Sequence, residues 1–168
     1  DDLWLIVRRT INGATVRYVE VLRQPLADDA EQEDAFYVDS GVTYDGAPTT
    51  TITGLTHLEG QTVAVLTDGA THPTRTVSAG SITLQRQASV AHVGLPYTAT
   101  IAGMDLEAGA GNGTAQGKVK RIYRSAVRLL RTLGGRAGTA EDKLDTLQFR
   151  NASVPMGSAP PLFTGDKT

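Results

Sequence analysis

Residues 57–84 read HLEGQTVAVLTDGATHPTRTVSAGSITL, and this stretch is the most informative about the fold. Runs of alternating apolar and polar residues over 62–67, 74–77 and 81–84 predict short strands. Between them stand Asp68-Gly69 and Ala79-Gly80, and glycine supplies the positive φ that tight turns require. The stretch therefore predicts a small antiparallel β module.

The same pattern extends on both sides of this stretch. Ser40-Gly41 and Asp45-Gly46 are further predicted turns, and they separate additional short apolar runs. Strands are predicted at 35–38, 49–53, 62–67, 74–77, 81–84 and 92–101. Short strands at such regular spacing are typical of a small barrel or sandwich. Residues 35–105 are therefore predicted to form a small β-barrel-like module.

A β-hairpin is predicted at the start of the chain. Residues 3–9 and 15–23 are apolar or alternating, and Asn12-Gly13 between them is a strong hairpin signal. In the second arm neither face is cleanly polar, because valines lie on both, so both faces are expected to be covered. Trp4 lies in a strongly apolar run and is expected in the core.

Two segments outside the module are irregular in composition. Residues 28–34 hold five acids after Pro25, which favours a solvated loop over a cation site. Residues 106–117 are rich in glycine and alanine and predict a loop. Residues 139–168 contain three prolines and are expected to be mostly irregular, with one strand near 147–150.

Residues 119–133 are ambiguous. Val119, Ile122, Ala126 and Leu129 fit a helical stripe, whereas Tyr123, Val127 and Leu129 fit the alternation of a strand. Periodicity favours the helix by a small margin. With residues 1–34, the region 106–168 is predicted to form an antiparallel sheet region beside the module.

Composition sets the class of protein. The chain has 168 residues, of which 40% are hydrophobic and only 5% aromatic, and 18 are glycine, which favours strands and tight turns in an all-β fold with long loops. A net charge of -2 gives no overall attraction to nucleic acid or membrane. No apolar run approaches the ~20 residues of a membrane span, so none is expected. The chain opens inside a predicted strand and is interpreted as a fragment of a larger subunit.

No residue pattern points to catalysis. His57, His72 and His92 lack a second ligand at metal spacing, and the chain has no cysteine. Ser40 or Ser81 with a histidine from elsewhere is a pairing that any chain of this size offers. The acid pairs Asp39 with Asp45 and Asp105 with Glu107 fit turns better than a glycosidase, and the glycine-rich run 109–113 lacks the ending of a phosphate loop. We therefore predict no enzyme activity, no cofactor and no metal.

The strongest local charge feature is basic. Residues 118–136 contain seven lysines and arginines and no acid. Contact with DNA phosphates, pairing with a neighbouring subunit, and plain solvation or pairing within the chain all remain open. The candidate interface or DNA-channel residues are Lys118, Lys120, Arg121, Arg124, Arg128 and Arg131.

Several motifs together resemble a known family. They are Leu3-Trp-Leu-Ile-Val-Arg-Arg9, Phe36-Tyr-Val-Asp-Ser-Gly-Val-Thr-Tyr44, the 57–84 stretch and Leu162-Phe-Thr-Gly-Asp166. The chain resembles the β-rich region of tail nozzle (tail tubular) proteins of short-tailed bacteriophages and prophages. In that family the segment similar to 119–133 is extended, so the resemblance implies a strand there.

The resemblance implies a structural virion protein. Such nozzles are homo-oligomers, with six subunits expected, that attach to a tail adaptor protein and let double-stranded DNA pass during genome ejection. The implied location is the phage tail, after synthesis in the cytoplasm of the bacterial host. No catalytic residue and no small-molecule substrate carry over. The alternative is a carbohydrate- or receptor-binding β module of a tail or cell-surface protein, with Trp4, Tyr37, Tyr44 and Tyr97 as candidate aromatics.

Overall fold

The computed structural model describes residues 2–104, 114, 117–119, 121–155 and 158–168. It confirms a mainly β chain with several antiparallel sheets. The chain divides into two compact units, one of Asp1–Tyr97 with Met156–Ala159 and one of Thr98–Pro155 with Pro160–Thr168. The predicted grouping of 1–34 with 106–168 in one sheet region stays a prediction.

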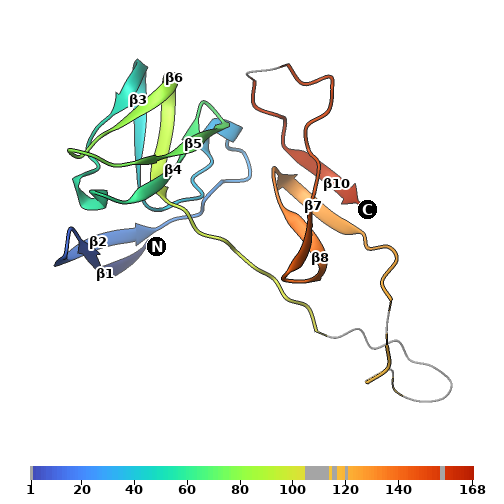
Figure 1. Cartoon of the computed structure of the whole chain (residues 1–168). Helices are drawn as coiled ribbons and strands as arrows, with labels where there is room; N and C mark the ends of the chain where they lie inside the picture. Colours follow the sequence, from blue (N-terminus) through green and yellow to red (C-terminus); the bar gives the residue numbers. More distant parts are fainter. Residues whose placement is uncertain (1, 105–113, 115–116, 120, 156–157) are drawn as a thin grey trace. The chain divides into compact units, whose positions relative to one another are not determined.

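The first unit contains a hairpin and a four-stranded sheet (Figure 1). In the hairpin β1 (Leu3–Ile11) pairs with β2 (Ala14–Leu22). The sheet has the order β3-β6-β4-β5, and the described strands form no closed barrel. Its strands are β3 (Asp39–Ile52), β4 (Thr62–Thr67), β5 (Ala70–Thr76) and β6 (Ile82–Leu95), and the single-turn 3-10 helices are η1 (Gln32–Asp34) and η2 (Thr56–Leu58).

Three predicted turns are confirmed, each with positive φ at both central residues. Asn12 and Gly13 have φ of 48° and 77°, and Asp68 and Gly69 have 46° and 73°. Ala79-Gly80, at 52° and 66°, is the third. Two positive φ values in succession define the primed turns whose twist matches that of the flanking strands. The local sequence therefore set these three reversals.

The other two predicted turns are wrong. Ser40-Gly41 and Asp45-Gly46 both lie inside β3, which continues through them. The pairing of β3 with β6 shifts register between Asp39 and Val42 and again between Asp45 and Thr49. Ser40, which has a positive φ of 49°, lies at the first of these register shifts. These residues therefore form bulges in one long strand, because pairing with β6 outweighs the local turn signal.

The predicted strand boundaries beside the sheet also need correction. Residues 35–38 are irregular, and the strand predicted over 92–101 ends at Leu95. Phe36 is held by contacts outside this segment, not by strand pairing. Its backbone N–H donates to the Pro25 carbonyl, and its ring meets His92 edge-on. The predicted strand at 62–67 matches β4 residue for residue.

Replacing Gly69 with valine should lower the free energy of unfolding by about 1–2 kcal/mol, because a β-branched residue disfavours positive φ. A Cβ at this position would have its nearest neighbour at 3.4 Å, so backbone strain and not crowding causes the loss. Gly69→Asn is the control, since asparagine tolerates this conformation. Thermal unfolding of the two variants checks the assignment, and equal melting temperatures would contradict it.

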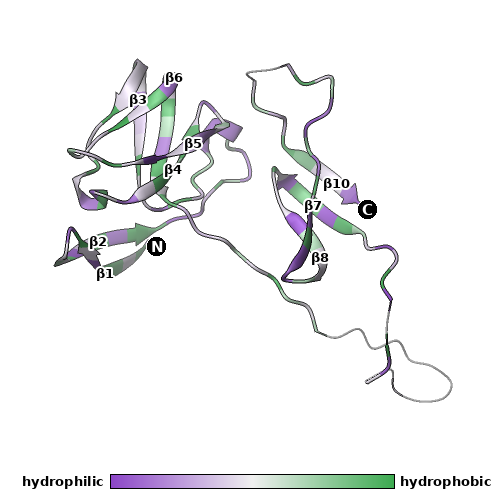
Figure 2. Ribbon diagram, in the orientation of Figure 1, coloured by the Kyte–Doolittle hydropathy of each residue, from purple (hydrophilic) through white to green (hydrophobic). Residues whose placement is uncertain are grey.

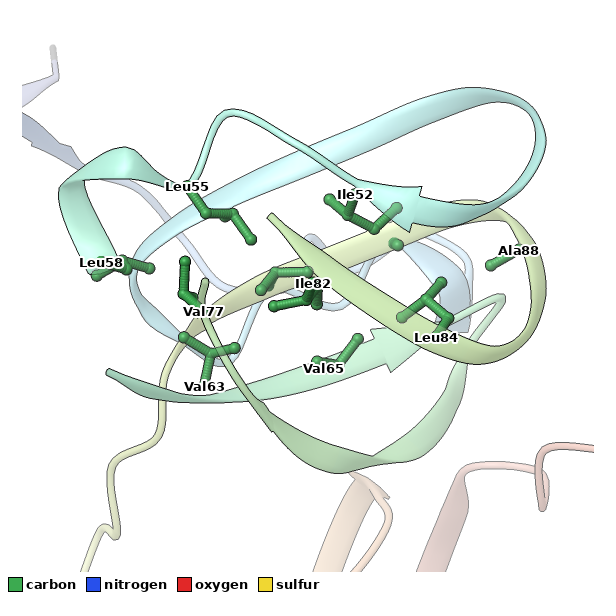
Figure 3. Close-up of a cluster of buried hydrophobic side chains, with 11 residues drawn as sticks. Ile52, Leu55, Leu58, Val63, Val65, Val77, Ile82, Leu84 and Ala88 are labelled. Carbon is green, nitrogen blue, oxygen red and sulfur yellow. The ribbon is translucent and has the colours of Figure 1, made fainter. Parts of the chain in front are cut away.

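The hydrophobic core lies inside the first unit (Figure 3). Residues from β3, η2, β4 and β6 point into it, with Leu55 and Val77 from the connecting segments. The buried set is Ile52, Leu55, Leu58, Val63, Val65, Val77, Ile82, Leu84, Ala88, Ala91 and Val93. Trp4 does not belong to it. Its side chain is 63% exposed, so the prediction that it is a core residue is wrong.

The second unit consists of two strand pairs. β7 (Val127–Thr132) pairs with β10 (Phe163–Lys167), and β8 (Arg136–Ala140) pairs with β9 (Lys143–Thr146). Figure 2 shows hydrophobic and hydrophilic residues interspersed along β7. None of this unit's described residues is buried.

The ambiguity over 119–133 is resolved in part. Residues 127–132 form a strand, as predicted, whereas residues 121–126 are irregular, and no described part of the segment is helical. The expectation of a mostly irregular tail is confirmed, because within 139–168 only residues 139–140, 143–146 and 163–167 lie in strands, whereas the strand predicted near 147–150 is wrong. The predicted 106–117 loop lies almost wholly outside the described residues. In the described part of the chain, no helix is long and apolar enough to cross a membrane.

Candidate interaction site

An open groove of about 1060 Å³ lies within the first unit. Consecutive residues of β2, from Tyr18 to Leu22, line one side, and consecutive residues 38–43 line the other. The side chains of a strand alternate between its two faces, so an unbroken run of lining residues indicates that the edge of the strand faces the groove. β2 and β3 are each the last strand of their sheet. The groove therefore runs between two strand edges.

The walls of the groove are mixed in chemistry. Leu5, Phe36, Val38 and Val42 supply apolar surface. Its charged lining residues are Glu20, Arg23, Asp34 and Asp39, so acids outnumber bases. A groove of this kind is suited to an extended ligand that carries both apolar and positively charged groups.

A charged network joins the hairpin to the sheet beside the groove. Arg9 donates to Glu20 through Nε at 3.3 Å and through Nη2 at 3.2 Å. The same Nη2 contacts Asp39 Oδ2 at 3.4 Å. Ser40 Oγ donates to Glu20 Oε1 at 2.5 Å. The Arg9 and Glu20 side chains are only 16% and 21% exposed, whereas Asp39 is 57% exposed, so the Arg9–Glu20 pair is the shielded part of the network. The contacts to Asp39 and Ser40 hold the hairpin against the start of β3.

The network perturbs the acidity of Glu20. Burial alone would raise the pKa of the Glu20 carboxyl, but hydrogen bonds from Arg9 and Ser40, with the charges of Arg9 and His57, outweigh it. The pKa of Glu20 therefore lies below its ordinary value of 4.5. Sequence analysis missed this network, because its partners come together only when the hairpin folds against β3.

The lowered pKa of Glu20 gives the chain an acid-sensitive contact. The contact contributes stability above the unfolded-state pKa and loses it as the pH falls through the lower folded-state pKa. Unfolding by urea from about pH 6 down to about pH 3 should show stability declining below about pH 4.5. Glu20→Gln should flatten that part of the profile. Identical profiles for the two proteins would contradict the role of this carboxylate.

Each of the three histidines is hydrogen-bonded within the first unit. His57 Nε2 donates to the Ser40 carbonyl at 2.8 Å, and its ring meets Tyr18 edge-on. In His72, Nε2 accepts from the Gln85 amide at 2.9 Å and Nδ1 donates to the Pro73 carbonyl. His92 Nε2 donates to the Glu33 carbonyl, and Nδ1 lies 2.8 Å from Thr43 Oγ1. Among the described residues, no cluster of three potential ligands could hold a metal ion.

Among the described residues, the candidate serine and carboxylate pairs make other contacts or lie far apart. Ser40 and His57 do meet, but His57 binds the main-chain carbonyl while Ser40 Oγ donates to Glu20. Asp39 and Asp45 lie six positions apart along β3, or roughly 20 Å of extended chain. Glycosidase carboxyl pairs are about 5–9.5 Å apart, so this pair does not fit that reaction. Ser81 Oγ donates to the Ser78 carbonyl inside a turn, and Asp105, Glu107 and residues 109–113 lie outside the described residues.

The predicted basic residues fall into two groups. Lys118, Arg121 and Arg124 are exposed and form no hydrogen bond or ion pair with another described residue, whereas Lys120 lies outside the described residues. Arg128 lies in β7 and donates twice to Asp166 of β10, at 2.7 and 2.9 Å. This hydrogen bond lowers the pKa of Asp166.

Arg131 belongs with the second group, because it too takes part in the pairing of β7 with β10. It has a φ of 44°, and its backbone N–H donates to Thr164 Oγ1 at 3.0 Å. Of the six candidates, Arg128 and Arg131 thus serve the second unit itself. Lys118, Arg121 and Arg124 are the ones that remain as candidates for contact with another molecule.

Comparison with known proteins adds no family assignment. No protein-family model matches the chain, and no curated protein matches it either.

Proposed function

We propose that the chain is a structural subunit of a phage tail nozzle, which forms the distal tail channel through which the genome is ejected. In this proposal the protein is a homo-oligomer, with a hexamer expected, located in the virion. It attaches to a tail adaptor protein, and double-stranded DNA passes through it without chemistry. The resemblance of the sequence motifs supplies the specific identity, and the exposed apolar surface supports the need for neighbouring subunits.

The observation that carries the proposal is the amount of apolar surface left open. On the hairpin Trp4 faces Val21 and Ile6 faces Val19 across the strands, which places the four on one side. Trp4, Ile6 and Val19 are 63%, 78% and 68% exposed. A two-stranded hairpin is marginally stable alone, and exposed apolar patches mark interaction sites.

The second unit also leaves apolar side chains exposed that neighbouring chains would cover. Its described residues include none that is buried, and Leu130 of β7 is 75% exposed. The pair of rings Phe149 and Phe163 meets edge-on, with Lys167 lying 4.4 Å from the centre of the Phe163 ring. Such a small cluster supplies little burial, so we infer that this unit gains much of its stability from contacts with other chains.

The test is the oligomeric state of the chain. Light scattering at increasing concentration, with negative-stain imaging of any large species, should show a closed ring near six subunits. Trp4 is the sole tryptophan, so its fluorescence emission should shift to shorter wavelength as the hairpin face is covered. A chain that remains monomeric at every concentration, with unchanged Trp4 emission, would count against the proposal.

One observation favours the alternative, a carbohydrate- or receptor-binding module. Trp4, Tyr37 and Tyr97 are each more than half exposed, and exposed aromatic rings form the usual platform for sugars. Among the described residues, however, none of these three rings contacts another aromatic ring. The three rings therefore do not form a joint sugar-binding platform, and the exposed apolar face of the hairpin favours the subunit proposal. Tryptophan fluorescence that responds to glycans in a monomeric chain would support this alternative instead.

A further inference from the structure

We propose that the groove between β2 and β3 receives the basic arm of a second copy of this chain, defined as the described residues 117–119 and 121–126. The inference rests on the proposed homo-oligomer and specifies one contact within it. It assigns the groove an occupant and gives the arm a binding partner.

The first argument is backbone complementarity. β2 and β3 end their sheets, and consecutive residues of both line the groove, so main-chain N–H and C=O groups border it on two sides. An extended segment placed there would pair with the free edge of one of the two sheets, the mode of recognition called β-augmentation. Residues 121–126 have no regular secondary structure, so they are available for such pairing.

The second argument is charge. Glu20 and Asp39 in the lining are already paired with Arg9, so the charge that faces the arm comes from Asp34 and the acidic segment 28–34, which reaches the groove at Ala30 and Asp34, and it exceeds the single charge of Arg23. The arm carries Lys118, Arg121 and Arg124, which are exposed and have no described ion-pair partner. Opposite charges on the two surfaces would select the correct partner and accelerate association.

The third argument is apolar surface. In the arm Val119 is fully exposed, Tyr123 is 92% exposed and Ile122 is 45% exposed. The groove offers Leu5, Phe36 and Val42 as apolar lining, and a volume of about 1060 Å³ accommodates several residues. Plain solvation accounts for the charges of the arm but not for apolar side chains placed between them. Docking in the groove accounts for both.

A charge-swap experiment tests the contact. The arm variant is Arg121→Glu with Arg124→Glu. The rim variant is Asp29→Lys with Asp34→Lys, chosen because both residues are exposed, Asp34 lines the groove and Asp29 directly precedes its lining residue Ala30. Each variant alone places like charges together and should self-associate at least about tenfold more weakly than the parent chain in sedimentation equilibrium. An equimolar mixture pairs an acidic arm with a basic rim, and a basic arm with an acidic rim, and should restore association.

A matched control separates this contact from a general effect of charge. Glu141→Lys with Asp142→Lys reverses two exposed acids in the turn between β8 and β9 and should leave association unchanged. Circular dichroism confirms that each variant retains its strands. Variants that associate like the parent, or a mixture no stronger than its components, would overturn the groove assignment while leaving the proposed oligomer intact.

A synthetic peptide tests binding in the groove independently of self-association. If the parent chain is monomeric, the proposed function fails, and the groove is tested with a labelled peptide of residues 117–127. Fluorescence anisotropy should then show binding to the parent chain and at least about tenfold weaker binding to the rim variant. No binding to the parent, or equal binding to both, would overturn the inference.

Discussion

Replacing Leu58 with alanine is expected to lower the free energy of unfolding of the module by about 2–5 kcal/mol. Leu58 is fully buried in η2, where it closes one end of the core. The truncation removes buried apolar surface and leaves a cavity that the surrounding strands fill only in part. Urea denaturation, with hydrogen exchange of the amides of β4 and β6 as a local probe, measures the loss.

Leu130→Ala is the matched control for this substitution. It removes the same atoms from a side chain that is 75% exposed, so stability should change by no more than about 0.5 kcal/mol. Equal effects at both positions would show that the core is not where the structure places it.

The second large effect is expected at Gly94. Gly94 is buried in β6, and a Cβ there would lie 2.8 Å from both the Asp39 carbonyl oxygen and the Gly41 Cα of β3. These are backbone atoms of the paired strand, so they move only if the strands separate. Gly94→Val is therefore expected to cost about 1–3 kcal/mol through overpacking. Thermal unfolding and the exchange of amides in β3 and β6 measure it.

Gly103→Val provides the comparison. Gly103 has no positive φ, and no atom lies within 4 Å of a Cβ built on it, so this substitution should change stability by no more than about 0.5 kcal/mol. A Gly94 variant as stable as the Gly103 variant would mean that β3 and β6 do not approach as closely as described. Val42 of β3 lies opposite Val93, the residue before Gly94 in β6. The close approach at Gly94 would therefore also hold β3 in register with β6.

Prediction from the sequence succeeded where the signal was local. The 62–67 strand and the Asp68-Gly69 turn follow from alternation and from a dipeptide that favours positive φ. Prediction failed at Asp45-Gly46, whose dipeptide carries the same signal, because the neighbouring β6 keeps β3 extended through it. The difference between the two Asp-Gly pairs lies in their tertiary partners.

The candidate site shows the same limit. Basic residues near 118–131 were visible in the sequence, but Arg128 pairs with Asp166, which lies 38 positions farther along the chain in β10. The Arg9–Glu20–Asp39–Ser40 network was not foreseen, because no spacing rule relates residues 9 and 20 of a hairpin to residues 39 and 40 of another sheet.

Local signals in the sequence were enough to predict the mainly β class, the three primed turns and the periodicity of β4, because these depend on φ preferences and on alternation within a few residues. The pairing of the strands, the exposure of Trp4 and the groove beside β2 and β3 became visible only in the folded chain. These features depend on contacts between residues distant in the chain, and the free energy of such contacts is not encoded in any short segment.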